Sequence, residues 1–323
     1  MPVWLSMLII AIPTYWYARL VRGIDRFEQE PAKYLIVAFL WGALPAAFLA
    51  LVLQLVFAVP VAALWGEDAS RLALAVVFAP VTEELVKGLA VAALYLWRRR
   101  EFDGWVDGIV YGSTVGFGFA YVENIIYLAS TDGFGHWLQL FLLRVIVFGF
   151  MHGFYTSLIG IGFGVARHAS SRRQGLFAIA LGWGAAIATH AIHNASLVFA
   201  EASGATTLLI ALLNYGLLIA LMLGLRYLSR RNDDRMFKIY LADEVPGVIT
   251  SQAYAVLSGA KERSAPRLSP AFRHLAGELA QRKRQLIQYG EAAANADGEI
   301  DRLRERLRAL SYPQSHVSPA PRP

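Results

Sequence analysis

Long apolar stretches fill the first 228 residues of the chain and alternate with short polar connectors. A helix of about 20 predominantly apolar residues is long enough to cross a bilayer. Seven stretches meet this requirement, at residues 3–20, 34–64, 70–97, 105–128, 137–165, 175–200 and 205–228. The pattern therefore predicts an all-α polytopic membrane protein with about seven transmembrane helices.

A different pattern begins after residue 228. Apolar residues recur at helical spacing over 268–287 and 299–310, with lysine and arginine on the remaining faces. Residues 311–323 are rich in proline and serine. We predict a transmembrane domain over residues 1–228 and a soluble helical tail over residues 229–323, disordered after about residue 311.

Basic residues gather in every second connector. They follow the first, third, fifth and seventh apolar stretches: Arg19, Arg22, Arg26, Lys33, Arg98, Arg99, Arg100, Arg167, Arg172, Arg173, Arg226, Arg230 and Arg231. Cytoplasmic loops of membrane proteins carry the excess of lysine and arginine. The asymmetry therefore predicts an N-terminus outside the cell and a tail in the cytoplasm.

Composition narrows the possible chemistry. The chain has 323 residues, is 56% hydrophobic, carries a net charge of +6 and has no cysteine. Residues 229–323 hold 16 Lys and Arg against 11 Asp and Glu, so most of the basic surplus lies in the tail. A solvated or lipid-facing surface explains this surplus without a nucleic-acid partner. Any metal must be held by histidine and carboxylate groups, because thiolates are absent.

Ionisable residues interrupt the apolar stretches at a small number of positions. Seven of them are Glu83, Glu84, Lys87, Glu123, His152, His190 and His193. Such groups are costly in hydrocarbon, so they are expected to face one another or a water-filled cavity. A polar reaction site inside the membrane is the predicted result. Arg144 is also intramembrane and could pair with a carboxylate, in a role that the sequence leaves undecided.

Glycine recurs at every fourth position from Gly104 through Gly108 and Gly112 to Gly116. A row of small residues makes a flat helix face on which a neighbouring backbone can pack closely. We predict tight packing of this helix, which would help to hold polar groups of different helices within bonding distance.

The third apolar stretch contains Pro80, Glu83, Glu84 and Lys87. Proline cannot donate to the helix ladder, so Pro80 is expected to kink the helix just before the two glutamates. Lys87 lies three and four residues after them and can neutralise either one. We expect one glutamate to pair with Lys87 and the other to face the reaction centre, and we favour Glu84 as the latter. A buried ion pair without a catalytic role is the structural alternative.

The sixth apolar stretch places His190, His193 and Asn194 on one helix face, at spacings of three and four residues. Two imidazoles at this spacing can share a metal, or one can act as a base while Asn194 donates to an oxyanion. Glu123 and His152, on two further helices, add groups suited to a hydrolytic centre.

These residues fall into motifs that resemble the PrsW family of intramembrane proteases. In chain order the motifs are Ala79-Pro80-x-x-Glu83-Glu84-x-x-Lys87, Asp107–Gly112 with Gly116–Asn124, His152-Gly153 and His190-x-x-His193-Asn194. The family is related to the CAAX-processing and bacteriocin-immunity proteases. Their Phe-x-x-x-His element is here Phe119-x-x-x-Glu123, so His152 becomes the candidate to supply the imidazole.

The resemblance implies hydrolysis of a peptide bond in or at the edge of a bacterial-type cell membrane. It also implies a membrane-anchored protein substrate, with the first cut in an anti-sigma factor as the case known for the family. The partners expected for this chain are therefore a membrane-anchored protein and the lipid bilayer.

Our leading hypothesis for the mechanism is a metalloprotease. Glu84 would act as general base on a water held by a divalent metal, with zinc as the favoured ion. The expected ligands are His152, His190 and a carboxylate, either Glu123 or Glu83. Bound zinc lowers the pKa of its water to about 7.

Two alternatives stay open. A glutamate assisted by histidine could activate water without a metal, and in both versions Asn194 or His193 would stabilise the oxyanion. The alternative from another class is a proton- or ion-coupled transporter, because transporters also use buried Glu, Lys and His on broken helices. The two halves of the membrane domain show no internal repeat, which disfavours a transporter.

Overall fold

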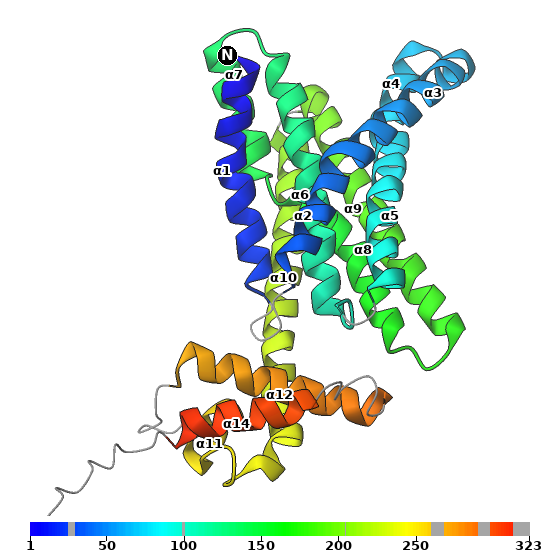
Figure 1. Cartoon of the computed structure of the whole chain (residues 1–323). Coiled ribbons are helices and arrows are strands. Elements are labelled where there is room, and N and C mark those ends of the chain that lie inside the picture. Colours follow the sequence, from blue (N-terminus) through cyan, green and yellow to red (C-terminus); the bar gives the residue numbers. More distant parts are fainter. Residues whose placement is uncertain (25–29, 99–100, 204, 260–267, 290–297, 313–323) are drawn as a thin grey trace, which may run out of the picture. The chain divides into compact units, whose positions relative to one another are not determined.

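The computed structural model describes residues 1–24, 30–98, 101–203, 205–259, 268–289 and 298–312 (Figure 1). Every regular element in these ranges is a helix, so the predicted all-α fold is confirmed. The chain forms two compact units, Met1–Asp25 with Glu30–Met222, and Arg26–Gln29 with Leu223–Pro323. Disorder is predicted after about residue 311, and residues 313–323 lie outside the described residues.

The first unit is a bundle of helices around α6. Its helices are α1 (Val3–Arg22), α2 (Ala32–Trp41), α3 (Ala47–Trp65), α4 (Glu67–Ala73), α5 (Ala79–Trp97), α6 (Trp105–Ala129), α7 (Phe134–Phe141), α8 (Met151–Arg167), α9 (Arg172–Ser203) and the first part of α10 (Ala205–Tyr240). Three π-helical segments, η1 (Gly42–Ala46), η2 (Leu74–Phe78) and η3 (Leu142–Val147), follow α2, α4 and α7. Helices α1, α2, α5 and α8 pack against α6, and α9 packs against α8 (Figure 1).

Five helical segments among the described residues are long and apolar enough to cross a membrane. They are Val3–Arg22, Ala32–Trp65, Phe134–Arg167, Arg172–Phe199 and Leu209–Leu228. The predicted count of about seven is not confirmed, because α5 and α6 are not in this set. Helix α5 carries three charged residues close together, and α6 is rich in glycine and buried along most of its length. The protein is a multi-pass integral membrane protein, and large apolar side chains such as Trp4, Leu8 and Ile12 lie exposed on α1.

The glycine row on α6 packs against α8 as predicted. A Cβ atom added to Gly108 would lie 2.1 Å from the Gly160 carbonyl oxygen, and one added to Gly116 would lie 2.2 Å from the His152 carbonyl oxygen. Real Cβ atoms do not approach this closely, so only glycine permits the contact. The backbone of His152 is thereby held directly against α6, the helix that carries Glu123.

Pro80 shapes the start of α5. In a π-helix the N–H of each residue bonds to the carbonyl five residues earlier, and proline has no N–H. Pro80 therefore leaves the carbonyl of Ala75, in η2, without this donor. The side-chain amide of Asn194 supplies a hydrogen bond to that carbonyl instead, at 2.9 Å. The break in the regular helix lies one turn before Glu83, where the sequence predicted a kink.

The second unit is a small helical domain with its own apolar core. It contains the end of α10, a short 3₁₀ turn (Ala242–Glu244), α11 (Ser251–Leu257), α12 (Pro270–Tyr289) and α14 (Glu299–Ser311). Phe237, Leu279 and Leu303 are among its buried core residues. The carboxylate of Glu244 joins two helices, because it accepts hydrogen bonds from Lys283 at 2.7 Å and from Arg304 at 2.8 Å.

Replacing Glu244 by glutamine is expected to loosen this domain by about 2 kcal/mol, the usual contribution of hydrogen bonds to a charged group. Burial raises the pKa of Glu244, but hydrogen bonds from Arg304 and Lys283 outweigh burial and hold it below the usual 4.5. The wild-type advantage should be complete above pH 4.5 and disappear as the pH falls through the lowered pKa. Limited proteolysis of the full chain at pH 7 and at low pH measures both effects. Equal digestion of the two proteins at pH 7 would contradict the assignment.

Candidate active site

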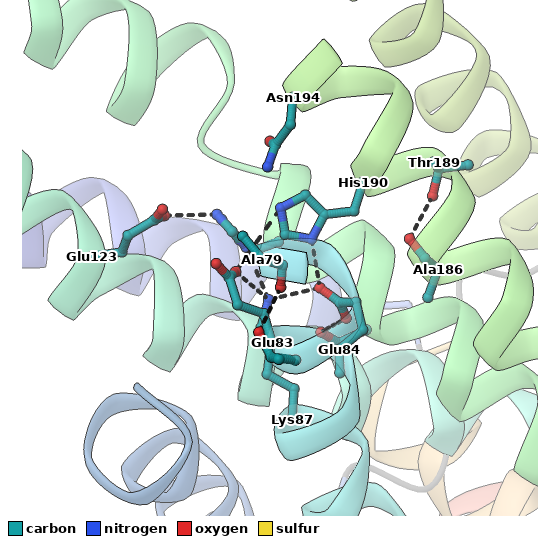
Figure 2. A network of polar contacts seen from close by, with 12 residues as sticks. Ala79, Glu83, Glu84, Lys87, Glu123, Ala186, Thr189, His190 and Asn194 are labelled. Carbon is teal, nitrogen blue, oxygen red and sulfur yellow. Dashed lines mark hydrogen bonds and ion pairs between the residues drawn. The ribbon is translucent and has the colours of Figure 1, made fainter. Parts of the chain in front are cut away.

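Helix α5 presents two carboxylates to a buried lysine. The Lys87 amine lies 2.7 Å from Glu84 Oε1 and 3.4 Å from Glu83 Oε2, and its side chain is completely buried (Figure 2). The same amine lies 4.1 Å from the centre of the Phe119 ring, which adds a cation–π contact. The spacing of three and four residues along one helix explains why one lysine reaches both carboxylates.

Glu84 is fully engaged by its neighbours. Besides the contact with Lys87, its Oε2 accepts a hydrogen bond from the Thr156 hydroxyl at 3.0 Å. Its Oε1 accepts one from His190 Nδ1 at 3.1 Å. The Glu84 side chain has no exposed surface. Its two oxygens together contact residues of three helices, α5, α8 and α9.

Glu83 is the member of the pair that lines a cavity. Its Oε1 accepts a hydrogen bond from the Gln54 amide at 3.2 Å, and its Oε2 lies 3.9 Å from His190 Nε2. Lys87 contacts both carboxylates, but only Glu83 of the pair lines the cavity, while Glu84 is enclosed. The sequence favoured Glu84 as the carboxylate at the reaction centre, and the geometry places Glu83 nearer to open space.

The contacts of His152 and His190 select one tautomer for each neutral ring. His152 Nε2 lies 2.8 Å from a Glu123 oxygen, and its Nδ1 lies 3.1 Å from the Lys87 amine. A carboxylate only accepts and an ammonium only donates, so the proton of His152 is on Nε2 and the lone pair is on Nδ1. The contact of His190 Nδ1 with Glu84 puts its proton on Nδ1 and its lone pair on Nε2, toward Glu83.

Glu123 and Arg144 form an ion pair beside His152. Arg144 Nη2 lies 2.9 Å from Glu123 Oε2, and Arg144 Nε donates to Asn124 Oδ1 at 3.1 Å. The guanidinium also lies 3.7 Å from the centre of the Tyr127 ring. Glu123 is therefore shared between an arginine and the far side of the His152 ring.

His193 and Asn194 lie on the same helix but differ in their partners. Asn194 bonds to the carbonyl of Ala75, as described above. His193 is 8% exposed and lines the cavity, and its Nδ1 has no hydrogen-bond partner within the described part of the chain. His193 is thus the better placed of the two to meet a ligand in the cavity.

The cavity has a volume of about 690 Å³, is partly open, and is lined by residues of the first unit. Its polar lining comprises Gln54, Arg71, Glu83, Glu123, Asn124, Tyr127, Arg144, His152, His190, His193 and Asn194. Apolar side chains of several helices line the rest, and two of those on α3, Leu51 and Leu55, are also exposed on the outside of the bundle. The lining thus combines groups suited to catalysis with an apolar wall.

Glu83, His152 and His190 can hold a metal ion. One ligand atom from each lies within 4.8 Å of the other two. Two imidazoles and one carboxylate form a ligand set of known catalytic zinc sites, so the chemistry of the donors fits. His190 Nε2 lies 3.9 Å from Glu83 Oε2, whereas His152 Nδ1 lies 3.1 Å from the Lys87 amine, which a metal at this nitrogen would have to displace. Of the two carboxylates expected from the sequence, Glu83 belongs to this group, while Glu123 lies 2.8 Å from His152 Nε2.

Sequence reasoning missed three residues of the site. Tyr155 stacks on His190, with ring centroids 4.5 Å apart, Thr156 bonds to Glu84, and Gln54 bonds to Glu83. Tyr155 and Thr156 follow His152 by three and four residues, so helical spacing alone could have placed them on the same face.

A family model described as "PrsW family intramembrane metalloprotease" matches residues 30–225. The chain is 32% identical over 165 residues to Protease PrsW of Geobacillus kaustophilus (strain HTA426). The aligned region covers 51% of this chain and 66% of the relative. The chain is 25% identical over 165 residues to Protease PrsW of Bacillus subtilis (strain 168), with 51% and 68% covered. For Protease PrsW of Clostridioides difficile (strain 630) the identity is 30% over 126 residues, with 39% and 50% covered.

The matched segment therefore spans between one half and about two thirds of these relatives. No solved structure matches the chain. The family match begins two residues before α2, ends in the apolar part of α10 and includes every residue of the cluster described above. On this evidence the chain belongs to the PrsW family of intramembrane metalloproteases.

Proposed function

We propose that this chain is an intramembrane endopeptidase that hydrolyses a peptide bond of a membrane-anchored protein. The observation that carries the proposal is the meeting of Glu83, His152 and His190 at a cavity inside a bundle of apolar helices. A purely structural bundle has no use for such a cluster, because each buried ionisable group is costly in a membrane.

In the metal-free version, Glu83 is the general base. Its carboxylate takes a proton from a water molecule in the cavity as the water oxygen bonds to the scissile carbonyl carbon. Glu83 then gives the proton to the amide nitrogen, the C–N bond breaks, and a new carboxyl end and a new amino end are released. His193 is the donor to the carbonyl oxygen as negative charge develops there, because its ring lines the cavity with an unused nitrogen.

In the metal version, Glu83, His152 and His190 hold a divalent ion, with zinc as the proposed metal. Such an ion supplies a bound water whose pKa is lowered to about 7. Glu84 has no opening to the cavity, so it keeps the role of base that the sequence favoured only by acting through His190, which donates to it at 3.1 Å. In both versions Glu83 acts at the reaction centre.

We further propose that the N-terminus lies outside the cell and the tail in the cytoplasm of a bacterial-type cell. Arg71, at the end of the third apolar stretch that is predicted to lie outside, lines the same cavity as Glu83, which supports access from that side. The substrate proposed is a single-span membrane protein, with an anti-sigma factor as the specific case implied by the sequence motifs.

The test compares new protein N-termini by mass spectrometry. Membranes from cells that express the wild-type chain are set against membranes with an equal amount of the Glu83→Gln variant, at rest and under envelope stress. New ends in or beside a single-span protein, found with the wild type alone, are expected. Identical sets of ends under both conditions would contradict the proposal and favour a transporter.

Removal of metal is expected to lower cleavage about a hundredfold. The reason is that a metal-bound water contributes several kcal/mol to stabilisation of the transition state, and roughly 1.4 kcal/mol corresponds to a tenfold change in rate. Protein purified in a chelator is assayed before and after addition of Zn²⁺, with its metal content measured in parallel. Full activity of metal-free protein would exclude the metal version and leave Glu83 as the base.

A further inference from the structure

Within the described residues, two arginines line the cavity, Arg71 and Arg144, and Arg144 is the one that contacts Glu123. The mechanism above gives it no role, although an arginine inside a membrane helix is costly and needs a compensating function or partner. We propose that Arg144 is a positioning residue that acts through Glu123 to hold His152 in its working orientation. The role of Arg144 in holding His152 does not depend on the proposed function; only the statement that this orientation serves peptide hydrolysis rests on it.

The first step is the contact between Arg144 and α6. The guanidinium reaches three groups of one helix face, the Glu123 carboxylate, the Asn124 amide oxygen and the Tyr127 ring. A planar fork with several donors can make all three contacts at once, whereas a lysine offers a single compact charge. The three contacts together fix where the Glu123 carboxylate lies.

The second step is the contact between Glu123 and His152. Glu123 Oε2 lies 2.8 Å from His152 Nε2, while His152 Nδ1 lies 3.1 Å from the Lys87 amine. The ammonium can only donate, so the lone pair is on Nδ1 and the proton is on Nε2, beside the carboxylate. A carboxylate bonded to the outer nitrogen of a histidine fixes both the tautomer and the ring orientation of that histidine. Arg144 is thus the third member of a chain that runs from Arg144 through Glu123 to His152.

The third step is charge. Three carboxylates, Glu83, Glu84 and Glu123, lie at the site with two cations, Lys87 and Arg144. Lys87 already contacts the first two, so without Arg144 it would be the nearest counter-charge for all three. Glu123 would then be drawn toward Lys87, and its 2.8 Å contact with His152 Nε2 would be lost.

The local helix geometry supports this arrangement. Arg144 lies in the π-helical segment η3, and His152 lies at the start of α8, directly after a break in the helix at Phe148–Phe150. A π-helical segment changes the direction of the side chains that follow it. Both side chains can therefore reach Glu123 from the same stretch of chain.

The decisive readout is the tautomer of His152, which neither metal nor substrate is needed to observe. The ring nitrogens of ¹⁵N-histidine-labelled full-length protein are measured by NMR in lipid, and the His152 signals are assigned with a His152→Gln variant. We expect one species in the wild type, with the proton on Nε2, and a mixture of tautomers in Arg144→Gln and in Glu123→Gln. Arg144→Lys should lie between them, since lysine keeps the charge and loses the fork.

Cleavage of the identified substrate gives the second readout. Glu123→Gln should lower it by about 10- to 100-fold, the usual loss when the outer partner of an active-site histidine is removed, and Arg144→Gln by no more than this, because it acts through Glu123. The double variant Arg144→Gln/Glu123→Gln should cleave no more slowly than Glu123→Gln alone, because the two residues act in one chain. Arg98→Gln is the matched control and should cleave like the wild type. Arg98 lies 5.1 Å from the centre of the Tyr34 ring and does not line the cavity.

Two results would overturn the proposal. One is a single Nε2-protonated His152 in Arg144→Gln. The other is a double variant whose loss equals the product of the two single losses, which would assign Arg144 a role independent of Glu123. A wild-type chain that cleaves nothing would instead count against the proposed function, while the tautomer measurement would still decide the role of Arg144.

Discussion

Replacing Glu83 by glutamine lowers cleavage by about 10²- to 10⁴-fold, the range expected when a general base is lost. Glutamine keeps the size of the side chain and can still accept the hydrogen bond from Gln54, so the cavity keeps its shape. It cannot take a proton from water, and it is a poor ligand for a metal. The loss is therefore expected in both versions of the mechanism. The measurement is the initial rate in proteoliposomes with a substrate that spans the identified cleavage site.

Glu84→Gln gives the comparison that separates the two carboxylates. Glu84 is enclosed by Lys87, His190 and Thr156, so its replacement should lower thermal stability as well as activity. Glu83→Gln should lower activity alone, because Lys87 keeps its closer partner at 2.7 Å. Glu67→Gln, an exposed glutamate on α4, is the control and should change neither.

The opposite result has a definite meaning. If Glu83→Gln cleaves normally while Glu84→Gln is inactive at full thermal stability, the base is Glu84, as the sequence first suggested. A carboxylate without an opening to the cavity would then have to act through His190, with which it shares a hydrogen bond.

The association of the carboxylate pair with Lys87 could be predicted from the sequence because it is local. Residues three and four positions apart on a helix are neighbours whatever the rest of the fold does. The glycine row also predicted its contact, because a helix face without side chains allows a neighbouring helix to pack closely. Both features depend on a single helix.

Contacts between helices could be predicted only in outline. The sequence indicated that Glu123 belongs to the site, but not whether it would meet a metal or the outer nitrogen of His152. That distinction depends on how α6 and α8 are rotated about their axes. Arg144 was seen as a possible partner for a carboxylate, and the structure identifies the carboxylate as Glu123.

The face of His190, His193 and Asn194 shows the same limit. Helical spacing predicts that these residues point the same way, but it gives no information on their partners. Asn194 is drawn to the Ala75 carbonyl because Pro80 and the π-helical segment η2 leave that carbonyl without a backbone donor. A π-helical segment has no marked periodicity in the sequence, so this partner could not be foreseen.

Replacing Lys87 by methionine is expected to destabilise the first unit by about 3–5 kcal/mol, the cost of removing one partner of a buried ion pair. Methionine matches the length of lysine and fills the same space, so the change removes charge with little loss of packing. Glu84, with no exposed surface, would keep only its hydrogen bonds to His190 and Thr156. Thermal unfolding in detergent measures the effect. The protein is treated with chelator beforehand, because a bound cation could compensate for the missing ammonium.

The double variant Lys87→Met/Glu84→Gln tests whether charge is the cause. The double variant removes the unpaired charge of Glu84 but leaves Glu83, 3.4 Å from the Lys87 amine in the wild type, without its cation. It should therefore recover part of the lost stability. A defect in packing would instead persist in the double variant. Lys33→Met, at an exposed lysine of α2, is the matched control and should unfold like the wild type. Unchanged unfolding of Lys87→Met would mean that Lys87 is not the counter-charge that allows Glu83 and Glu84 to lie buried side by side.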